Sequence, residues 1–250
     1  MADLAERKPV HVLSRDEIEQ MLASHRLYLE TGYHEGHRAN FASADLTGRD
    51  FSRLNLRGVK MDRAVLRGTD FTGTDLRGAN LIGAIAEQAR FDRADLSRAR
   101  LSGANLVSAS FEKARLGRAE MEFALMANVV LRGACLGEAD MSGAQLDRAV
   151  IIGADLRKAN LRGAGLRGAQ LDAADLRMLG WAMPSWSEPH CEMPICAAPI
   201  YGWQSSTAPT CPTPILEGAE GVTQAQLDRA HLSVGTRLPG DLTGVKNAKR

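Results

Sequence analysis

The chain has 250 residues, and its 31 Lys and Arg residues nearly balance its 30 Asp and Glu residues, which leaves a formal net charge of +1. Such a balance disfavours direct binding to nucleic acid, which needs a strongly basic surface. No stretch approaches the ~20 consecutive apolar residues of a membrane-spanning helix. We therefore expect a cytoplasmic protein that makes no contact with a membrane and whose four cysteines are free thiols.

The first 40 residues are predicted to form a flexible start and a helical cap. Residues 1–13 lack a long apolar run, and we expect them to be flexible. A helix is predicted over residues 14–31, because Ser14-Arg15-Asp16-Glu17 is a capping box and apolar residues such as Ile18 and Leu22 fall near one face. The cap, residues 14–40, would mask the open end of the structure that follows.

Three histidines in this cap, His25, His34 and His37, suggest a metal site. Neither a Cys nor a paired carboxylate completes a recognised ligand spacing around them. We therefore predict no metal site and no cofactor.

Residues 41–180 repeat with a period of five. The unit reads A-(D/N)-L-x-x, and every fifth residue from Phe41 to Leu176 is large and apolar except Ala86. Ala stands two places earlier in 22 of the 28 units, and Gly stands two places later in 12. A period of five fits neither a helix nor a strand, because both would scatter the apolar residues over opposite sides. Each unit must therefore contain its own turn, where Gly supplies a positive φ.

A second period is marked by Phe51, Phe71, Phe91 and Phe111, which are spaced by twenty. Four units are thus predicted to complete one coil and to stack these rings as a structural core. The 28 units give about seven coils, or roughly 34 Å at ~4.8 Å per coil. Local widening is expected where the inward residues depart from the pattern, at Arg49, Leu54, Val59, Ala86 and Val129. Burial of Arg49 would require a partner.

This pattern resembles the pentapeptide-repeat family over residues 41–180. The resemblance implies an all-β solenoid, a right-handed quadrilateral β-helix in which the central Leu or Phe and the preceding Ala point inward.

The segment 181–220 is rich in Pro, Cys and Trp, and the period of five persists there, with Pro in the position of the inward Ala. It either continues the solenoid as degenerate repeats or packs irregularly over the last coil, which we favour because Pro donates no backbone hydrogen bond. In a continued solenoid Cys191 and Cys211 would stack as a thiol pair that oxidation could bridge. Alternatively, zinc could be bound by His190, Cys191, Cys196 and Cys211. Residues 221–250 are predicted to form a short helix and a tail.

An enzyme is not expected, because the repeats contain no His and a single Cys, and catalysis needs unlike groups that converge in a pocket. The segment 163–168 does match G-x-G-x-x-G. The match is interpreted as fortuitous, because glycines recur at steps of five and no strand-then-helix context surrounds it.

A rigid rod offers flat faces, so we expect a scaffold that binds another protein of unknown identity or a second copy of itself. One basic column consists of Arg53, Arg93 and Lys113; another consists of Arg98, Arg118 and Lys158, interrupted by Glu138. An apolar patch is predicted at Phe123, Val130 and Val150, where the stretch from Met121 to Val130 is expected to be irregular.

The family resemblance adds an alternative function, because some pentapeptide-repeat proteins resemble duplex DNA, bind DNA gyrase or related topoisomerases and protect them from quinolones. Such mimicry needs a dense negative surface. Residues 41–180 contain 21 Lys and Arg against 17 Asp and Glu, which is the wrong sign. A third alternative is a thiol or zinc function of the segment 181–220.

Overall fold

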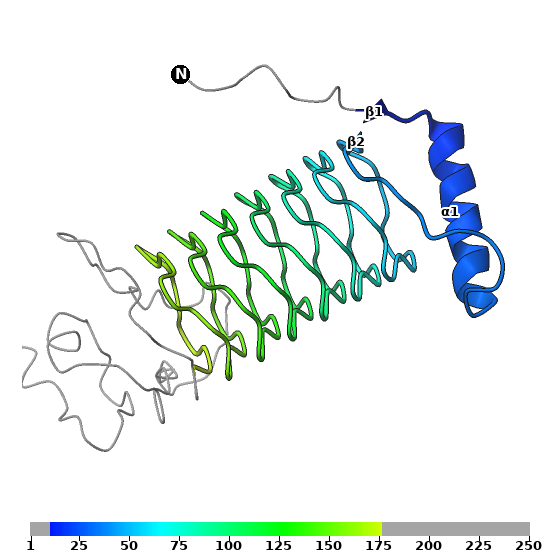
Figure 1. Ribbon diagram of the computed structural model, residues 1–250. Coiled ribbons are helices and arrows are strands. Elements are labelled where there is room, and N and C mark those ends of the chain that lie inside the picture. Colours follow the sequence, from blue (N-terminus) through cyan, green and yellow to red (C-terminus); the bar gives the residue numbers. More distant parts are fainter. Residues whose placement is uncertain (1–10, 177–250) are drawn as a thin grey trace, which may run out of the picture.

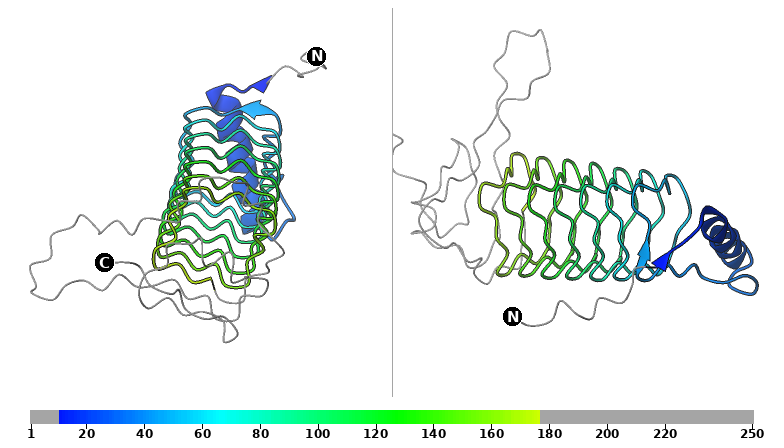
Figure 2. Two further views of the ribbon diagram at one scale, coloured as in Figure 1. Left: turned by 90° about the vertical axis from the view of Figure 1, so that its left-hand side faces the viewer. Right: turned by 90° about the horizontal axis from the view of Figure 1, so that it is seen from above.

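Residues 11–176, the part of the chain that the computed structural model describes, form a rod of stacked coils with a helix across one end (Figure 1). The elements in chain order are β1 (His11–Val12), α1 (Arg15–Glu30) and β2 (Ala44–Asp45). Parallel bridges join residues twenty apart along the rod, from the pair Asn40 and Lys60 to the pair Asp155 and Asp175. The predicted twenty-residue coil is confirmed, and Figure 2 shows the coils in line along one axis.

Backbone hydrogen bonds explain why the chain can bend every five residues without leaving polar groups unpaired. The N–H of Phe71 donates to Arg90 O one coil ahead at 2.7 Å, and the N–H of Asp70 donates to Arg49 O one coil back at 2.9 Å. The N–H of Thr74 donates to Phe71 O at 3.1 Å and closes a turn within the unit. Hydrogen bonds between neighbouring coils therefore pair the backbone N–H and C=O groups that helices or long strands pair in other folds.

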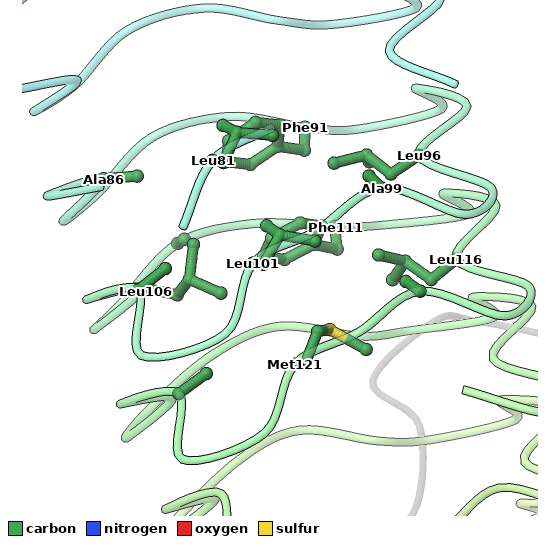
Figure 3. Packing of buried hydrophobic residues seen from close by; sticks show 14 of the residues in the cluster. Leu81, Ala86, Phe91, Leu96, Ala99, Leu101, Leu106, Phe111, Leu116 and Met121 are labelled. Atoms are coloured by element: carbon green, nitrogen blue, oxygen red, sulfur yellow. The ribbon is translucent and has the colours of Figure 1, made fainter. Parts of the chain in front are cut away.

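The interior is a ladder of equivalent positions. Phe91 lies over Phe111 with ring centroids 4.7 Å apart, and Phe71 lies over Phe91 at 5.0 Å, with nearly parallel planes in both pairs. Figure 3 shows Phe91 over Phe111 beside Leu81 over Leu101, with Ala86 in the ladder above Leu106. All of these side chains are buried. The stacked-Phe prediction is confirmed.

Two threonines occupy the inward position that Ala fills in most units. Thr69 and Thr74 are fully buried. The Thr69 hydroxyl donates to Leu46 O at 2.9 Å, and the Thr74 hydroxyl donates to Phe51 O at 2.7 Å. A polar side chain is tolerated inside the coil because its hydroxyl finds a backbone acceptor.

Many turns place the residue two after the inward centre in the left-handed region, which favours glycine. Gly73 has φ +67°, but Phe123 occupies the same turn position with φ +56°. A bulky side chain is unusual in this conformation. The backbone of that unit is nevertheless regular, because the N–H of Phe123 donates to Ser142 O at 2.9 Å.

Helix α1 closes the start of the rod. Ser14 is its N-cap and forms the predicted capping box with Glu17. Ile18 and His25 are buried, and Met21 and Leu22 pack against the hydrophobic core. The helical cap is therefore confirmed as a feature of this structure. No helix within residues 11–176 has the length and apolar content needed to cross a membrane.

The predicted flexible start is wrong for His11 and Val12. These residues form β1, which pairs in parallel with β2, so that Val12 lies opposite Asp45. The sequence pattern missed this strand because two residues are too few to show a period.

Three further expectations need correction or lie outside the described residues. The stretch from Met121 to Val130 is not irregular, because its backbone hydrogen bonds follow the same pattern as in the other coils. Arg49 is only half-buried, so the expected buried partner is not required. The predictions for 177–250, including the thiol pair Cys191 and Cys211 and the zinc ligands, lie beyond the described part of the chain.

Candidate functional site

Each coil contains four repeat units, and the outward residues of equivalent units form four columns along the rod, each of which is called a face here. The column consists of the residue that precedes each inward centre, because this residue points outward between two turns. Parallel bridges align its members one coil apart. The composition of each column therefore decides what that face can bind.

One of these faces has no charged residue in its central column from the second to the seventh coil. We call it the Leu125 face; its central column consists of Val65, Ile85, Asn105, Leu125, Gln145 and Gly165. The other three columns contain stacked charges, among them Arg100 and Glu120, Asp70 and Arg90, and Asp95 and Arg115. The Leu125 face thus has the longest uncharged central column; the column of Asp70 and Arg90 is uncharged only from Ser110 to Gln170. An uncharged column costs less to remove from water than one with stacked charges.

The turns on either side give the Leu125 face two unlike edges. One edge consists of Gly83, Gly103, Phe123 and Gly143, and the other of Glu87, Val107, Ala127 and Asp147. Lys and Arg are absent from both edges between the third and the sixth coil. Over these coils the named edge positions therefore carry only the negative charges of Glu87 and Asp147, and Phe123 is the one large apolar side chain among them.

Phe123 packs on the neighbouring coil and projects from the rod. Its side chain is 72% exposed, and a Cβ placed on Gly143 would lie 2.6 Å from Phe123 Cδ1. The ring therefore rests directly on the bare backbone of Gly143. Around Gly103, one coil in the other direction, a Cβ would meet no atom within 4 Å. The edge consequently combines a knob at Phe123 with an open notch at Gly103.

Two exposed large apolar side chains lie beside each other on this face. Of the five large apolar residues exposed in the described chain, Phe123 and Leu125 belong to it, whereas Val12 lies at the start of the rod, beyond the charged Asp45 of the same column. The two others, Leu27 and Tyr33, belong to the cap. A cluster of this kind on a protein surface is typical of a site of association.

The charges on the other faces are paired along the rod. Arg100 Nε lies 3.3 Å from Glu120 Oε2, and Arg90 Nη1 lies 3.3 Å from Asp70 Oδ2. These pairs are exposed, so each contributes little to stability. Their effect is to place positive and negative groups side by side on each of these faces.

The predicted basic columns are only partly basic. Arg53, Arg93 and Lys113 are exposed at one corner, in turns with φ between +56° and +59°. In the second column Arg118 Nε lies 2.9 Å from Glu138 Oε2. The hydrogen bond from Arg118 and its charge hold the pKa of Glu138 below the ordinary value. Whether either column binds a partner stays a prediction.

The predicted apolar patch is not a single surface. Phe123 lies at an edge of the Leu125 face, whereas Val130 and Val150 pair with each other in the central column of the next face and are half-buried. The expectation failed because a period of five carries the chain around a corner between Phe123 and Val130.

Leu125 was not predicted from the sequence, because an outward Leu is distinguished from an inward one only by its position within the repeat unit. Counting by twenties along the position before each centre would have found the uncharged column.

The structure does not bring the three cap histidines together. His34 and His37 are exposed, whereas His25 is buried and its Nδ1 accepts a hydrogen bond from the N–H of Ala39 at 3.2 Å. Burial lowers the pKa of His25, and the charge of Arg38 lowers it further. Within residues 11–176, no three His, Cys, Asp or Glu side chains are grouped as metal ligands. Cys135 is an exposed free thiol.

The chain belongs to the pentapeptide-repeat family. The family model for pentapeptide repeats (8 copies) matches residues 39–78, 74–112, 104–143 and 139–177. This match agrees with the resemblance drawn from the repeat unit and with the twenty-residue coils.

Several solved structures are similar to this chain. HetL, a pentapeptide repeat protein involved in heterocyst differentiation regulation from the cyanobacterium Nostoc sp. strain PCC 7120, is 28% identical; the match covers 67% of this chain and 86% of HetL, with a TM-score of 0.36. Rfr23, from the cyanobacterium Cyanothece 51142, is 22% identical over 64% of this chain and 99% of its own, with a TM-score of 0.36.

A trypsin-treated form of QnrB1, a plasmid-mediated fluoroquinolone resistance protein, is 22% identical over 55% of this chain and 74% of its own, also with a TM-score of 0.36. No curated protein matches the chain by sequence.

Proposed function

We propose that this chain is a cytoplasmic, non-catalytic scaffold that binds another protein through the Leu125 face. The observation that carries the proposal is the uncharged central column of that face, flanked by the exposed Phe123. Protein interfaces have cores depleted of charge and enriched in aromatic residues. We further propose that the coils have the right-handed, quadrilateral form expected for the family.

The absence of charge matters because binding must remove the surface from water. Burying the pairs of the other faces, such as Arg115 with Asp95 at 3.4 Å, would cost the desolvation of both groups. Burial of Leu125 and Phe123 is favourable instead, at about 25 cal/mol per Å² of apolar surface. The Leu125 face therefore offers a partner apolar surface without the desolvation of a charge in its central column.

The rigidity of the Leu125 face also favours binding. The coils on both sides of Phe123 are joined by backbone hydrogen bonds of 2.6 to 3.0 Å, so the face is fixed before a partner arrives. A surface that is already ordered loses little conformational entropy on binding.

The alternative of imitating DNA on a topoisomerase receives no support from the charge pattern. Each of the three charged faces mixes both signs along the rod, as with Asp70 and Arg90 or Arg100 and Glu120. A duplex presents negative charge at every step of its axis. We therefore place protein binding through the Leu125 face ahead of DNA mimicry.

The test is capture of partners from a bacterial lysate by the tagged full chain and by two variants. Phe123→Gly removes the projecting ring at a turn position where Gly is common, and Lys113→Gly makes the same kind of change at another corner. We expect partners to be lost with Phe123→Gly and kept with Lys113→Gly. The opposite result would transfer binding to the column of Arg53, Arg93 and Lys113.

The third alternative concerns the C-terminal cysteines and has its own measurement. A bait that lacks residues 181–250 would lose its partners if recognition lies there rather than on the rod. Zinc bound by His190, Cys191, Cys196 and Cys211 would appear in native mass spectra of the purified full chain.

A further inference from the structure

We propose that a second copy of this chain packs against the Leu125 face, with the two rods antiparallel and Phe123 of each copy seated in the glycine notch of the other. This inference rests on the proposed function of the face as a protein-binding surface and names the occupant. It is drawn from the order of side chains along one edge of the face, where Gly83 and Gly103 precede Phe123.

The edge is complementary to itself. A twofold axis that lies between the two faces, perpendicular to the rods and level with the gap between the fourth and fifth coils, exchanges those coils. Phe123 of one copy then faces Gly103 of the second copy, where a Cβ would meet no atom within 4 Å. The Phe123 ring leans toward Gly143, one coil further on, and so also approaches the level of the second copy's Gly83, where a Cβ would lie 3.7 Å from Arg63 Cγ. The open notch is therefore at Gly103.

The central column fits the same arrangement. The exchange of coils brings Leu125 over Asn105 of the second copy, and Ile85 over Gln145. No charged side chain of the central column is buried in this contact. The contact is isologous, so each favourable pair occurs twice and the assembly closes as a dimer.

The spacing of the coils makes the fit general along the contact. Both copies have the same rise per coil, so the coils of one copy stay level with the coils of the other along the whole contact. An unrelated partner would have to match this spacing independently. A second copy matches it by construction, which is why we infer self-association rather than a different flat protein.

The expected dimer is weak. Four coils at ~4.8 Å extend over only about 19 Å along the rod, so we expect the buried area to fall in the class of weak interfaces, below about 1,200 Å². At the rim, the same exchange brings Glu87 over Asp147 of the second copy within the four coils, and Arg67 over Arg167 just beyond them. These like charges oppose association. We therefore expect a Kd on the order of micromolar. Its dependence on salt should be small, because the core of the contact is uncharged and only the rim contributes charges.

The experiment is sedimentation velocity of the purified full chain from about 1 to 200 µM, a range that brackets the expected Kd, under reducing conditions that prevent disulfide-linked dimers. Four proteins are compared: wild type, Phe123→Gly, Gly103→Gln and Lys113→Gly. Gln is accommodated at the equivalent turn position by Gln88, which has φ +57°, so Gly103→Gln fills the notch with a side chain that the fold accepts. Thermal melts verify that every variant is folded.

We expect a concentration-dependent dimer for the wild type and for Lys113→Gly, and a dimer weaker by about tenfold or more for both Phe123→Gly and Gly103→Gln. A wild type that is monomeric throughout would overturn the inference, as would a dimer that survives both changes. A monomeric wild type would leave the proposed function separately testable. If the wild type captures partners from the lysate and Phe123→Gly does not, the face binds another protein although it does not bind a second copy.

Discussion

Replacing Phe71 by Ala tests the stacked core directly. Phe71 is fully buried between two parallel neighbours, with ring centroids 5.5 Å from Phe51 and 5.0 Å from Phe91. Truncating a buried Phe to Ala costs about 3–5 kcal/mol, because the transfer free energy is lost and a cavity remains. Each lost aromatic pair adds about 0.5–1.5 kcal/mol. The stack transmits this loss to both adjacent coils, since each coil contacts only its neighbours.

The assay is thermal unfolding followed by circular dichroism, together with amide hydrogen exchange. A loss of about 4 kcal/mol corresponds to a fall in Tm of roughly 8–16 °C for a folded region of this size. The matched control is Phe71→Leu, since Leu131 occupies the same ladder position further along, and it should cost less than about 1.5 kcal/mol. A Tm for Phe71→Ala within about 2 °C of the wild type would refute the reasoning, as would faster exchange that is spread evenly over all coils.

Three more outcomes are expected. First, His25 has a pKa below its unfolded value, so its contribution to stability is present above about pH 6.5 and is lost as the pH falls through the folded pKa. The cap should therefore loosen in acid. The variant His25→Gln should flatten this part of the pH profile of the free energy of unfolding. Second, Thr74→Val should lower the free energy of unfolding by about 1 kcal/mol, because the hydrogen bond to Phe51 O is lost while the shape of the side chain is kept; a Thr74→Val variant as stable as the wild type in urea titrations would contradict this. Third, the purified chain should not relieve the inhibition of gyrase supercoiling by ciprofloxacin. Relief of that inhibition would make DNA mimicry the leading function.

The repeat and its interior could be predicted from the sequence, because both depend on local periodicity. A period of five with Ala and a large apolar residue in each unit requires a turn per unit, and the twenty-residue spacing of Phe51 and Phe71 indicates four units per coil. The capping box at Ser14 likewise located the start of α1, since its hydrogen bonds join residues three apart.

The surface was predicted less well. Phe123 was expected to be exposed, and it is, but Val130 was wrongly assigned to the same patch. Proximity along the chain misleads here, because each unit turns a corner and neighbours in sequence soon lie on different faces. The pairing of β1 with β2 was missed for a related reason, since it joins residues far apart in the chain, such as Val12 and Asp45.

The sequence by itself determined the coil, its period and its inward residues, because a repeated local pattern has one way to bury its apolar side chains. Only the tertiary structure decided which outward residues share a face. Stacking of the coils aligns residues twenty apart, so Ile85, Asn105, Leu125 and Gln145 become one uncharged surface although charged residues separate them along the chain. That alignment, and the place of Phe123 beside Gly103 and Gly143, is what gives this rod a face on which we propose that another protein binds.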